Sequence, residues 1–295
     1  MPHITTDDGI RLFYEEEGAG TAIVFVHEFA GDHRSFEPQL RFFSRRYRVV
    51  AYNARGYPPS DVPATLERYS QDRARDDIKA MLDGLRIDKA HIVGISMGSY
   101  AALHFGLAYP SRALSLVLGG CGHGSTTDAA ARAQFQKDAE ATAASLDAHG
   151  MAPFAASYAV APSRVQFQNK DRRGWAEFAH QLAQHSAVGS AMTLRGVQGR
   201  RPSLYEIAPA MASLTVPVLV ATGDEDWQCL EPALFLKRSI PSAAVAMLPN
   251  TGHTLNIEEP ALFNVVCDDF FHQVESGRWP KRDPRALNVR SFGGR

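Results

Sequence analysis

Residues 90–98 read A-H-I-V-G-I-S-M-G, and this stretch decides the fold. Its first six residues form an apolar, β-branched run typical of a buried strand, and residues 97–108 favour a helix that stops at Tyr109-Pro110. Between them, G-I-S-M-G matches the pattern G-x-S-x-G, in which a serine lies on a tight strand-to-helix turn. Glycines flank such a serine because neighbouring side chains would collide there. Ser96 is therefore a candidate nucleophile, with a capping serine in a glycine-rich turn as the alternative.

Similar apolar runs recur along the chain, separated by segments of helix length. They are residues 22–27, 48–52, 90–95, 114–118, 217–222 and 243–248. Because these runs are mostly apolar and do not alternate strictly, they are predicted to be parallel strands covered on both faces. Helical patterns cover residues 70–86 (after the N-cap candidate Ser70), 97–108, 231–239 and 260–275. The sequence thus predicts an α/β fold: a mostly parallel, twisted sheet with helices on both faces, preceded by a hairpin over residues 3–17.

Residues 122–212 interrupt the alternation of strands and helices. No strand pattern occurs there, while residues 128–149 and 172–185 carry apolar stripes at helical spacing. We therefore predict an inserted cap of about four helices over residues 122–212, with a core of residues 1–121 and 213–275. The basic segment 276–295 is predicted to be an irregular, solvated extension. An arm that braces a second subunit is the alternative, so a homodimer is considered.

Composition narrows the classes of partner and location. The net charge of −1 and the isoelectric point of about 6.8 give no reason to expect nucleic acid or anionic lipid as a partner. The sequence contains no run of 18 apolar residues, which a membrane span would require. The N-terminus also lacks the pattern of a secretory signal, so a cytoplasmic location is expected. Cys121, Cys229 and Cys267 form no C-x-x-C pair and are predicted to be buried free thiols. Neither a metal nor a cofactor is expected.

A serine nucleophile needs a general base, and the base needs an orienting acid. The loop G-D-E-D-W at 223–227 follows the strand 217–222, and P-N-T-G-H-T at 249–254 follows the strand 243–248. Both loops lie at carboxyl ends of predicted strands, where ligands bind in such sheets. One of the acids at 224–226 and His253 can therefore converge on Ser96. No acidic residue follows the strand 114–118, which is the other strand end where the acid that orients the histidine could lie.

With these motifs the chain resembles the α/β-hydrolase family over about residues 3–275. The motifs are H-E-F-A-G at 27–31, Y-N-A-R-G-Y-P-P-S at 52–60, G-I-S-M-G at 94–98, G-D-E-D at 223–226 and G-H at 252–253. The chain is most similar to small esterases, enol-lactonases and carbon–carbon hydrolases with a helical cap. The resemblance implies Ser96 as nucleophile, Asp226 as acid and His253 as base. It also implies an oxyanion hole made by the backbone N–H groups of Phe29 and Met97.

The substrate pocket is expected to include Glu28, Trp175, Phe178 and Trp227, and Glu28 departs from the family pattern. Members of the family usually have glycine after the first histidine, here His27, which is expected to brace the oxyanion loop. Three interpretations of Glu28 are open. It pairs with a nearby cation such as Arg34 or Arg55, it projects into the pocket, or it faces solvent. A carboxylate in the pocket would repel anionic substrates and favour neutral or cationic ones.

The sequence therefore predicts a serine hydrolase that cleaves a small carboxylic ester or lactone through an acyl-enzyme. One alternative is a hydrolase of carbon–carbon bonds in a β-dicarbonyl or vinylogous ketone, which would use the same triad. That alternative is weakened because Thr254-Leu255, and not tryptophan, follows the histidine. The other alternative is a ligand-binding receptor that retains the hydrolase fold without catalysis.

Overall fold

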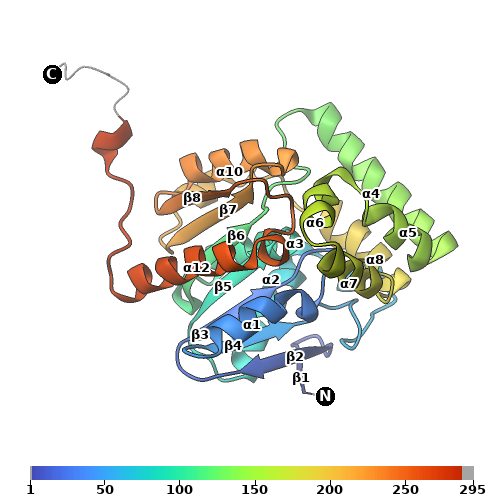
Figure 1. Ribbon diagram of the computed structural model, residues 1–295, viewed down its shortest axis with the longest axis horizontal. Helices are drawn as coiled ribbons and strands as arrows, with labels where there is room; N and C mark the ends of the chain where they lie inside the picture. Colours follow the sequence, from blue (N-terminus) through green and yellow to red (C-terminus); the bar gives the residue numbers. More distant parts are fainter. Residues whose placement is uncertain (1, 288–295) are drawn as a thin grey trace.

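An eight-stranded sheet runs through the computed structural model, which describes residues 2–287 (Figure 1). The strands are β1 (His3–Thr5), β2 (Arg11–Glu17), β3 (Ala22–Val26), β4 (Arg48–Tyr52), β5 (Ala90–Ile95), β6 (Ala113–Gly119), β7 (Val218–Gly223) and β8 (Ala243–Leu248). Their order in the sheet is β1-β2-β4-β3-β5-β6-β7-β8. Every pairing from β4 to β8 is parallel, whereas β1 pairs antiparallel with β2 and β2 pairs antiparallel with β4. The predicted mostly parallel sheet is confirmed, and each predicted strand ends within one residue of the observed one.

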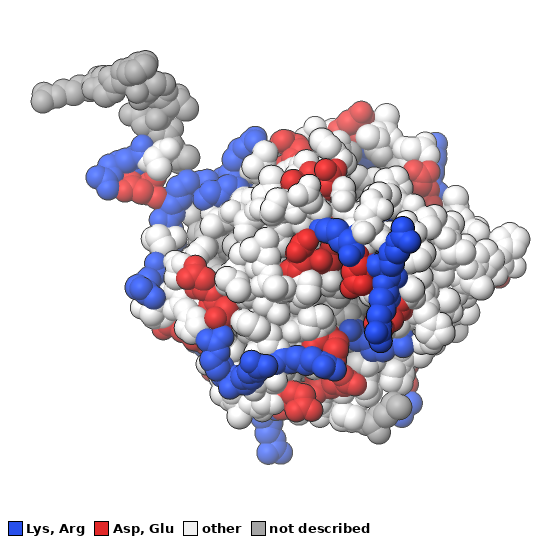
Figure 2. Space-filling view, in the orientation of Figure 1, with Lys and Arg blue, Asp and Glu red and all other residues white. Residues whose placement is uncertain are grey.

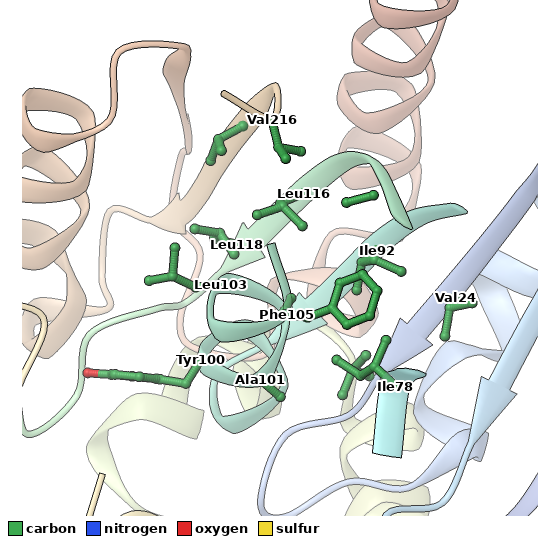
Figure 3. Packing of buried hydrophobic residues seen from close by; sticks show 14 of the residues in the cluster. Val24, Ile78, Ile92, Tyr100, Ala101, Leu103, Phe105, Leu116, Leu118 and Val216 are labelled. Atoms are coloured by element: carbon green, nitrogen blue, oxygen red, sulfur yellow. The ribbon is translucent and has the colours of Figure 1, made fainter. Parts of the chain in front are cut away.

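Helices cover both faces of the sheet. One face carries α2 (Gln71–Gly84), α3 (Met97–Ala108) and α10 (Trp227–Ser239), and the other carries α1 (Glu37–Phe43) and α12 (Pro260–Glu275). Val24 of β3 packs with the first set, whereas Ile23 and Phe25 pack with the second. Figure 3 shows Phe105 and Leu103 of α3 beside strand residues of the first face. Strands buried on both sides need apolar residues at every position, which explains why their sequences do not alternate.

Short helices complete the core. They are η1 (His33–Phe36), η2 (Leu66–Arg68), η3 (Pro110–Arg112), α11 (Leu255–Glu258) and η6 (Pro284–Leu287). Ser70 caps α2 as predicted, because its hydroxyl oxygen accepts a hydrogen bond of 3.0 Å from the amide of Arg73.

The segment between β6 and β7 is helical throughout and lies together at one end of the sheet (Figure 1). It contains α4 (Ala129–His149), α5 (Met151–Tyr158), η4 (Pro162–Arg164), α6 (Val165–Lys170), α7 (Arg172–Leu182), α8 (Ala187–Thr193), the π-helix η5 (Leu194–Gln198) and α9 (Ala208–Ala212). We call this segment the cap. It has six α-helices where the sequence indicated about four. Gly150, with φ of 74°, ends α4, and Pro162 opens a separate turn, so the helical patterns are divided into shorter pieces.

Part of the C-terminal extension packs on the core instead of extending into solvent. The indole N–H of Trp279 donates to the carbonyl of Ser242 at 2.8 Å, and its ring contacts Phe270 edge to face at 4.6 Å. The guanidinium of Arg282 donates to the carbonyls of Lys237 and Arg238, which end α10. Trp279 and Arg282 are half-buried and depart from the prediction of a solvated extension, because they supply packing and C-terminal capping, whereas the other residues from 276 to 286 are exposed. Residues 288–295 of that prediction lie outside the described residues.

The described surface agrees with the near-zero net charge. On the face seen in Figure 2, acidic and basic side chains are interspersed and do not form one large patch of a single sign. Between residues 2 and 287, no helix is long and apolar enough to cross a bilayer. The three cysteines are buried free thiols, as predicted.

Candidate active site

Ser96 occupies a strained turn between β5 and α3. Its φ of 52° and ψ of −110° lie outside the regions that residues with side chains favour. A Cβ atom at Gly94 would lie 2.2 Å from the carbonyl oxygen of Gly98, and one at Gly98 would lie 2.0 Å from that of Val26. Only glycine fits at both positions. Ser96 is the one residue from 90 to 103 that is not buried, so the turn lifts its hydroxyl out of the core.

Three loops at the carboxyl ends of β5, β7 and β8 bring Ser96, Asp226 and His253 together. His253 Nε2 lies 2.7 Å from Ser96 Oγ, and His253 Nδ1 lies 2.6 Å from Asp226 Oδ2. Burial alone would raise the pKa of Asp226, but the charge and hydrogen bond of His253, with a smaller effect of Cys229, lower it below its ordinary value. Asp226 is therefore ionised and accepts the Nδ1 proton, which leaves Nε2 free to accept the proton of Ser96.

The other two acids of the loop after β7 do not contact His253. The carboxylate of Asp224 accepts a hydrogen bond of 3.0 Å from the amide of Thr251, and the amide of Glu225 donates to the carbonyl of Thr251 at 2.9 Å. These bonds join the two loops that carry the acid and the base. Asp224 thus stabilises the loop geometry, while Asp226 is placed to orient the imidazole.

The candidate oxyanion donors lie on two segments that abut one another. Met97 is the first residue of α3, and Phe29 belongs to the loop that follows β3. A Cβ atom at Gly98 would lie 2.8 Å from the carbonyl oxygen of His27, so the start of α3 touches this loop. Among the described residues, neither the amide of Phe29 nor that of Met97 donates to another group. Both N–H groups are available to an acceptor, and Met97 adds the positive end of a helix dipole.

His27 holds the oxyanion loop by hydrogen bonds to the backbone on both sides of its ring. Its Nε2 accepts from the amide of Ala54 at 3.0 Å, so its Nδ1 carries the hydrogen and donates to the carbonyl of Glu28 at 2.7 Å. Burial lowers the pKa of His27 to about 4, which its bond to Glu28 only partly opposes. The imidazole is therefore neutral at physiological pH and fixes the tautomer that this loop requires.

The Glu28 side chain is buried and pairs with Arg164 of the cap helix η4. Arg164 Nη1 donates to Oε1 at 3.1 Å and Nη2 donates to Oε2 at 2.6 Å, while Glu28 is only 4% exposed. The expectation that Glu28 pairs with a cation is confirmed, but the cation is Arg164 and not Arg34 or Arg55, and the expectation that Glu28 faces solvent is wrong. Arg34 binds Asp32, and Arg55 binds Asp8 and Asp77. An ion pair between the core and the cap satisfies two buried charges that either segment alone would leave unpaired.

A cavity of about 300 Å³ opens beside the acid and the base of the triad, and its described lining does not include Ser96. Its lining residues are His123, Tyr158, Ala161, Pro162, Ser163, Glu225, Asp226, Trp227, Gln228 and His253. Of the four predicted pocket residues, Trp227 lines this cavity. Glu28 is not in the lining, Trp175 donates its indole N–H to the carbonyl of Ala159, and Phe178 lines a separate cavity beside α7.

Three lining residues were missed by reasoning from the sequence. Tyr158 and Ser163 come from the cap, where sequence patterns predict helices but not the direction in which each side chain points. His123 follows the glycine-rich end of β6, and its side chain is exposed at the cavity. Its place after the carboxyl end of a strand is a signal that could have identified it.

Cys229 lies behind the acid and the base of the triad. Its thiol donates to the carbonyl of Gly120 at 3.3 Å and lies 3.9 Å from His253 Nδ1. Ligand atoms of Asp226, Cys229 and His253 all lie within 4.8 Å of one another, which is close enough for a metal ion. Burial, and then the charge of Asp226, raise the pKa of Cys229 well above its ordinary value, so the thiol stays protonated. A metal would also have to displace the bond between His253 and Asp226, so these atoms suit the triad better than a metal.

Comparisons with known proteins identify the family and the fold of the chain. The profile of a family described as the alpha/beta hydrolase fold matches residues 21–260. The 3-oxoadipate enol-lactonase 1 of Acinetobacter baylyi is 27% identical over 275 residues, which cover 92% of this chain and 97% of that protein. The 2-hydroxy-6-oxononadienedioate/2-hydroxy-6-oxononatrienedioate hydrolase of Comamonas testosteroni is 27% identical over 274 residues, covering 88% and 91%. A thermophilic esterase from Thermogutta terrifontis superposes with a TM-score of 0.82 at 22% identity, covering 92% and 98% of the two chains.

Proposed function

Because the chain belongs to the alpha/beta hydrolase fold family, we propose that it is a serine hydrolase that cleaves a small carboxylic ester or lactone through an acyl-enzyme. The observation that carries the proposal is the pair of hydrogen bonds at His253, 2.7 Å to Ser96 and 2.6 Å to Asp226. Such a chain of nucleophile, base and orienting acid activates a hydroxyl that is otherwise a poor nucleophile. The cavity beside His253 gives a small acyl compound a place to bind.

In the first half of the reaction, Ser96 Oγ forms a bond to the substrate carbonyl carbon. His253 Nε2 takes the hydroxyl proton as this bond forms, and Asp226 stabilises the resulting imidazolium. When the tetrahedral intermediate collapses, the bond to the leaving alcohol breaks, and His253 gives the proton to the alcohol oxygen. In the second half, water attacks the acyl-serine ester with His253 again as base, which releases the acid and restores Ser96.

The oxyanion of the tetrahedral intermediate would be bound by the amides of Phe29 and Met97. Their free N–H groups and the adjacency of the two segments support this role. Two backbone donors aimed at the developing charge typically lower the barrier by several kcal/mol. Because backbone groups make this contact, the side chains of Phe29 and Met97 serve the site by packing, and both are buried in one cluster with cap residues.

A second candidate is hydrolysis of a carbon–carbon bond beside a ketone, with the same triad. The relative from Comamonas testosteroni, whose name describes a hydrolase of an oxononadienedioate, favours it. In that reaction the leaving group is a carbanion equivalent, which needs a proton on carbon in place of oxygen. The two reactions therefore differ in products but not in the residues that attack the carbonyl.

A panel of p-nitrophenyl esters, from acetate to octanoate, tests the proposal together with γ- and δ-lactones and one β-diketone. We expect turnover of at least one ester or lactone, and we expect Ser96→Ala to abolish it. The exposed residue Ser213 provides the matched control, since Ser213→Ala should retain wild-type rates. Turnover of the diketone alone would replace the proposal with the second candidate. Equal rates for wild type and Ser96→Ala would refute both.

A further inference from the structure

The cap helix η4 touches both catalytic loops through two adjacent residues. The carbonyl of Ser163 accepts a hydrogen bond of 3.2 Å from the amide of His253. The guanidinium of Arg164 binds both carboxylate oxygens of Glu28, the residue that precedes the oxyanion donor Phe29. Arg164 Nη2 also donates to the hydroxyl of Tyr158 at 3.0 Å. Tyr158 and Ser163 line the cavity, so the ion pair lies directly behind its wall.

Arg164 is the cation behind this wall to which a negatively charged substrate could bind. It is fully buried, and its guanidinium lies about 5 Å from the ring centroids of Tyr158 and Phe178. Burial is the largest single influence and works against its charge, but the charges and hydrogen bonds of Glu28 and Tyr158 together outweigh it and raise the pKa of Arg164. Glu28 occupies the two-pronged face of the guanidinium formed by Nη1 and Nη2, and Tyr158 takes a further bond from Nη2, so among the described residues only Nε has no partner. To the cavity, the pair presents almost no net charge.

The lining of the cavity holds no other cation. Its described lining contains the carboxylates Glu225 and Asp226 and no lysine or arginine. The other buried arginine nearby, Arg201, stacks on Tyr100 of α3 at 3.7 Å and donates to the backbone of His123, while its Nε and Nη1 have no partner among the described residues. Arg201 lies outside the lining and does not contact Glu28, so its charge acts alike on the wild type and on variants at Glu28.

We propose that Glu28 is a specificity-determining residue. Because it pairs with Arg164, that guanidinium does not bind a substrate carboxylate, and the site is restricted to uncharged esters or lactones. This inference rests on the proposed function and names the substrate class for it. A substrate carboxylate entering the cavity meets two like charges and a cation that is already paired, which disfavours its binding. With the charge of Glu28 removed, Arg164 becomes an unpaired buried cation behind the wall, and the same site attracts an anionic acyl group.

Two substrates of equal chain length test the proposal: p-nitrophenyl valerate, which is neutral, and the mono-p-nitrophenyl ester of glutaric acid, which ends in a carboxylate. For wild type we expect kcat/KM to favour the valerate by about tenfold or more. In Glu28→Gln, which keeps the shape and removes the charge, this ratio should move towards the glutarate ester by about tenfold or more. In the double variant Glu28→Gln/Arg164→Gln, the shift should disappear, because the released cation is gone.

The matched control is Glu258→Gln. Glu258 is a similarly buried acid that pairs with Lys170 and does not contact Arg164, so its loss changes the net charge equally without releasing this arginine. Its substrate ratio should stay within about twofold of wild type, because field effects at a distance are weaker than those of the adjacent charge. A wild type that hydrolyses the glutarate ester as well as the valerate would overturn the proposal even if no variant folds. So would equal shifts in Glu28→Gln and Glu258→Gln.

Failure of the proposed function can be told apart from failure of this inference. If wild type turns over none of the esters and lactones of the panel, including these two, the hydrolase proposal has failed. Thermal unfolding with glutarate as the probe then tests the charge argument alone. Stabilisation of Glu28→Gln by glutarate, but not of wild type or Glu258→Gln, would support a released Arg164. Equal stabilisation of all three proteins, or of none, would overturn it.

Discussion

The core loops and the cap helix η4 meet at one site but are held there by different means. Backbone constraints fix the core: Ser96 has a positive φ, and Gly94 and Gly98 have no room for a Cβ atom. The cap packs on the core through side chains: an apolar cluster that includes Phe29 and Met97, and at η4 the buried ion pair between Arg164 and Glu28. The catalytic turn therefore depends on backbone geometry, whereas the placement and charge of η4 depend on side-chain contacts. In this account the core loops make the reaction possible, and the contacts of the cap helix η4 select the substrate.

The strongest test of the core side is a pair of substitutions two residues apart. Asp226→Asn should lower kcat by about 10⁴-fold, because an amide cannot hold the Nδ1–H tautomer of His253. Asp224→Asn should cost less than about tenfold, since its amide oxygen can still accept the hydrogen bond from Thr251. Steady-state kinetics on one ester would decide the matter. A loss at Asp224 as large as that at Asp226 would show that the acid is assigned to the wrong residue.

The cap side is best tested through stability. Arg164→Met leaves the carboxylate of Glu28 buried without a partner, so the free energy of unfolding should fall by about 3–5 kcal/mol. Removing both charges in Glu28→Met/Arg164→Met should restore most of that loss, because an apolar pair needs no compensation. Urea unfolding measures both changes.

The control for this test is the exposed arginine Arg41, whose side chain is 77% exposed and pairs with Glu37. Arg41→Met should change stability by less than about 0.5 kcal/mol. If Arg164→Met were equally mild, the ion pair would not hold the cap, and the contrast between core and cap would fail.

Acid should weaken the core through a buried neutral histidine. Burial lowers the pKa of His27 to about 4, against an ordinary value of 6.5. Between these values the unfolded chain binds more protons than the folded one, so stability is full above pH 6.5 and falls as pH approaches 4. The loss is on the order of 3 kcal/mol. Urea unfolding at pH 7, 5.5 and 4.5 measures it, and a flat profile would mean that this ring is not buried and neutral.

The smallest effect is expected at the cavity mouth. Trp227 lines the cavity but is 75% exposed, so Trp227→Ala should alter the free energy of unfolding by less than about 0.5 kcal/mol. Its loss should nevertheless raise KM for long-chain acyl esters several-fold, because apolar contact area is removed. Trp279→Ala, on the packed extension, should show the opposite pattern of lower stability and unchanged KM. An unchanged KM in Trp227→Ala for every acyl length would remove this residue from the binding surface.

The sequence predicted the core far better than the cap, for physical reasons. Buried parallel strands need continuous apolar runs, and the turn at Ser96 needs glycines at fixed spacing, so both leave patterns that single residues reveal. Choosing Asp226 over Asp224 needed the family resemblance, because all three acids of that loop have the chemistry of an orienting group. The observed contact of Asp224 with Thr251 shows why a loop of this kind contains more than one acid.

The cap left fewer patterns to read. Arg164 is fully buried, yet in the sequence it looks like any surface arginine, because its partner Glu28 is 136 positions away. Periodicity also cannot show where a turn divides a helical stripe, so six α-helices were read as about four. Trp279 and Arg282 are similar cases, since their packing depends on the end of α10 and on β8. Contacts between segments that are distant in the sequence determine whether such side chains are buried, and local composition does not reveal these contacts.

The central claim is that Ser96 is a nucleophile activated by His253. Labelling with a fluorophosphonate, which reacts with activated serines, tests it directly when followed by mass spectrometry of the digested protein. The account predicts one phosphonyl group per chain on the peptide that contains Ser96, loss of esterase activity in proportion to labelling, and no labelling of Ser96→Ala. Labelling at another residue, or full activity in the completely labelled protein, would contradict it.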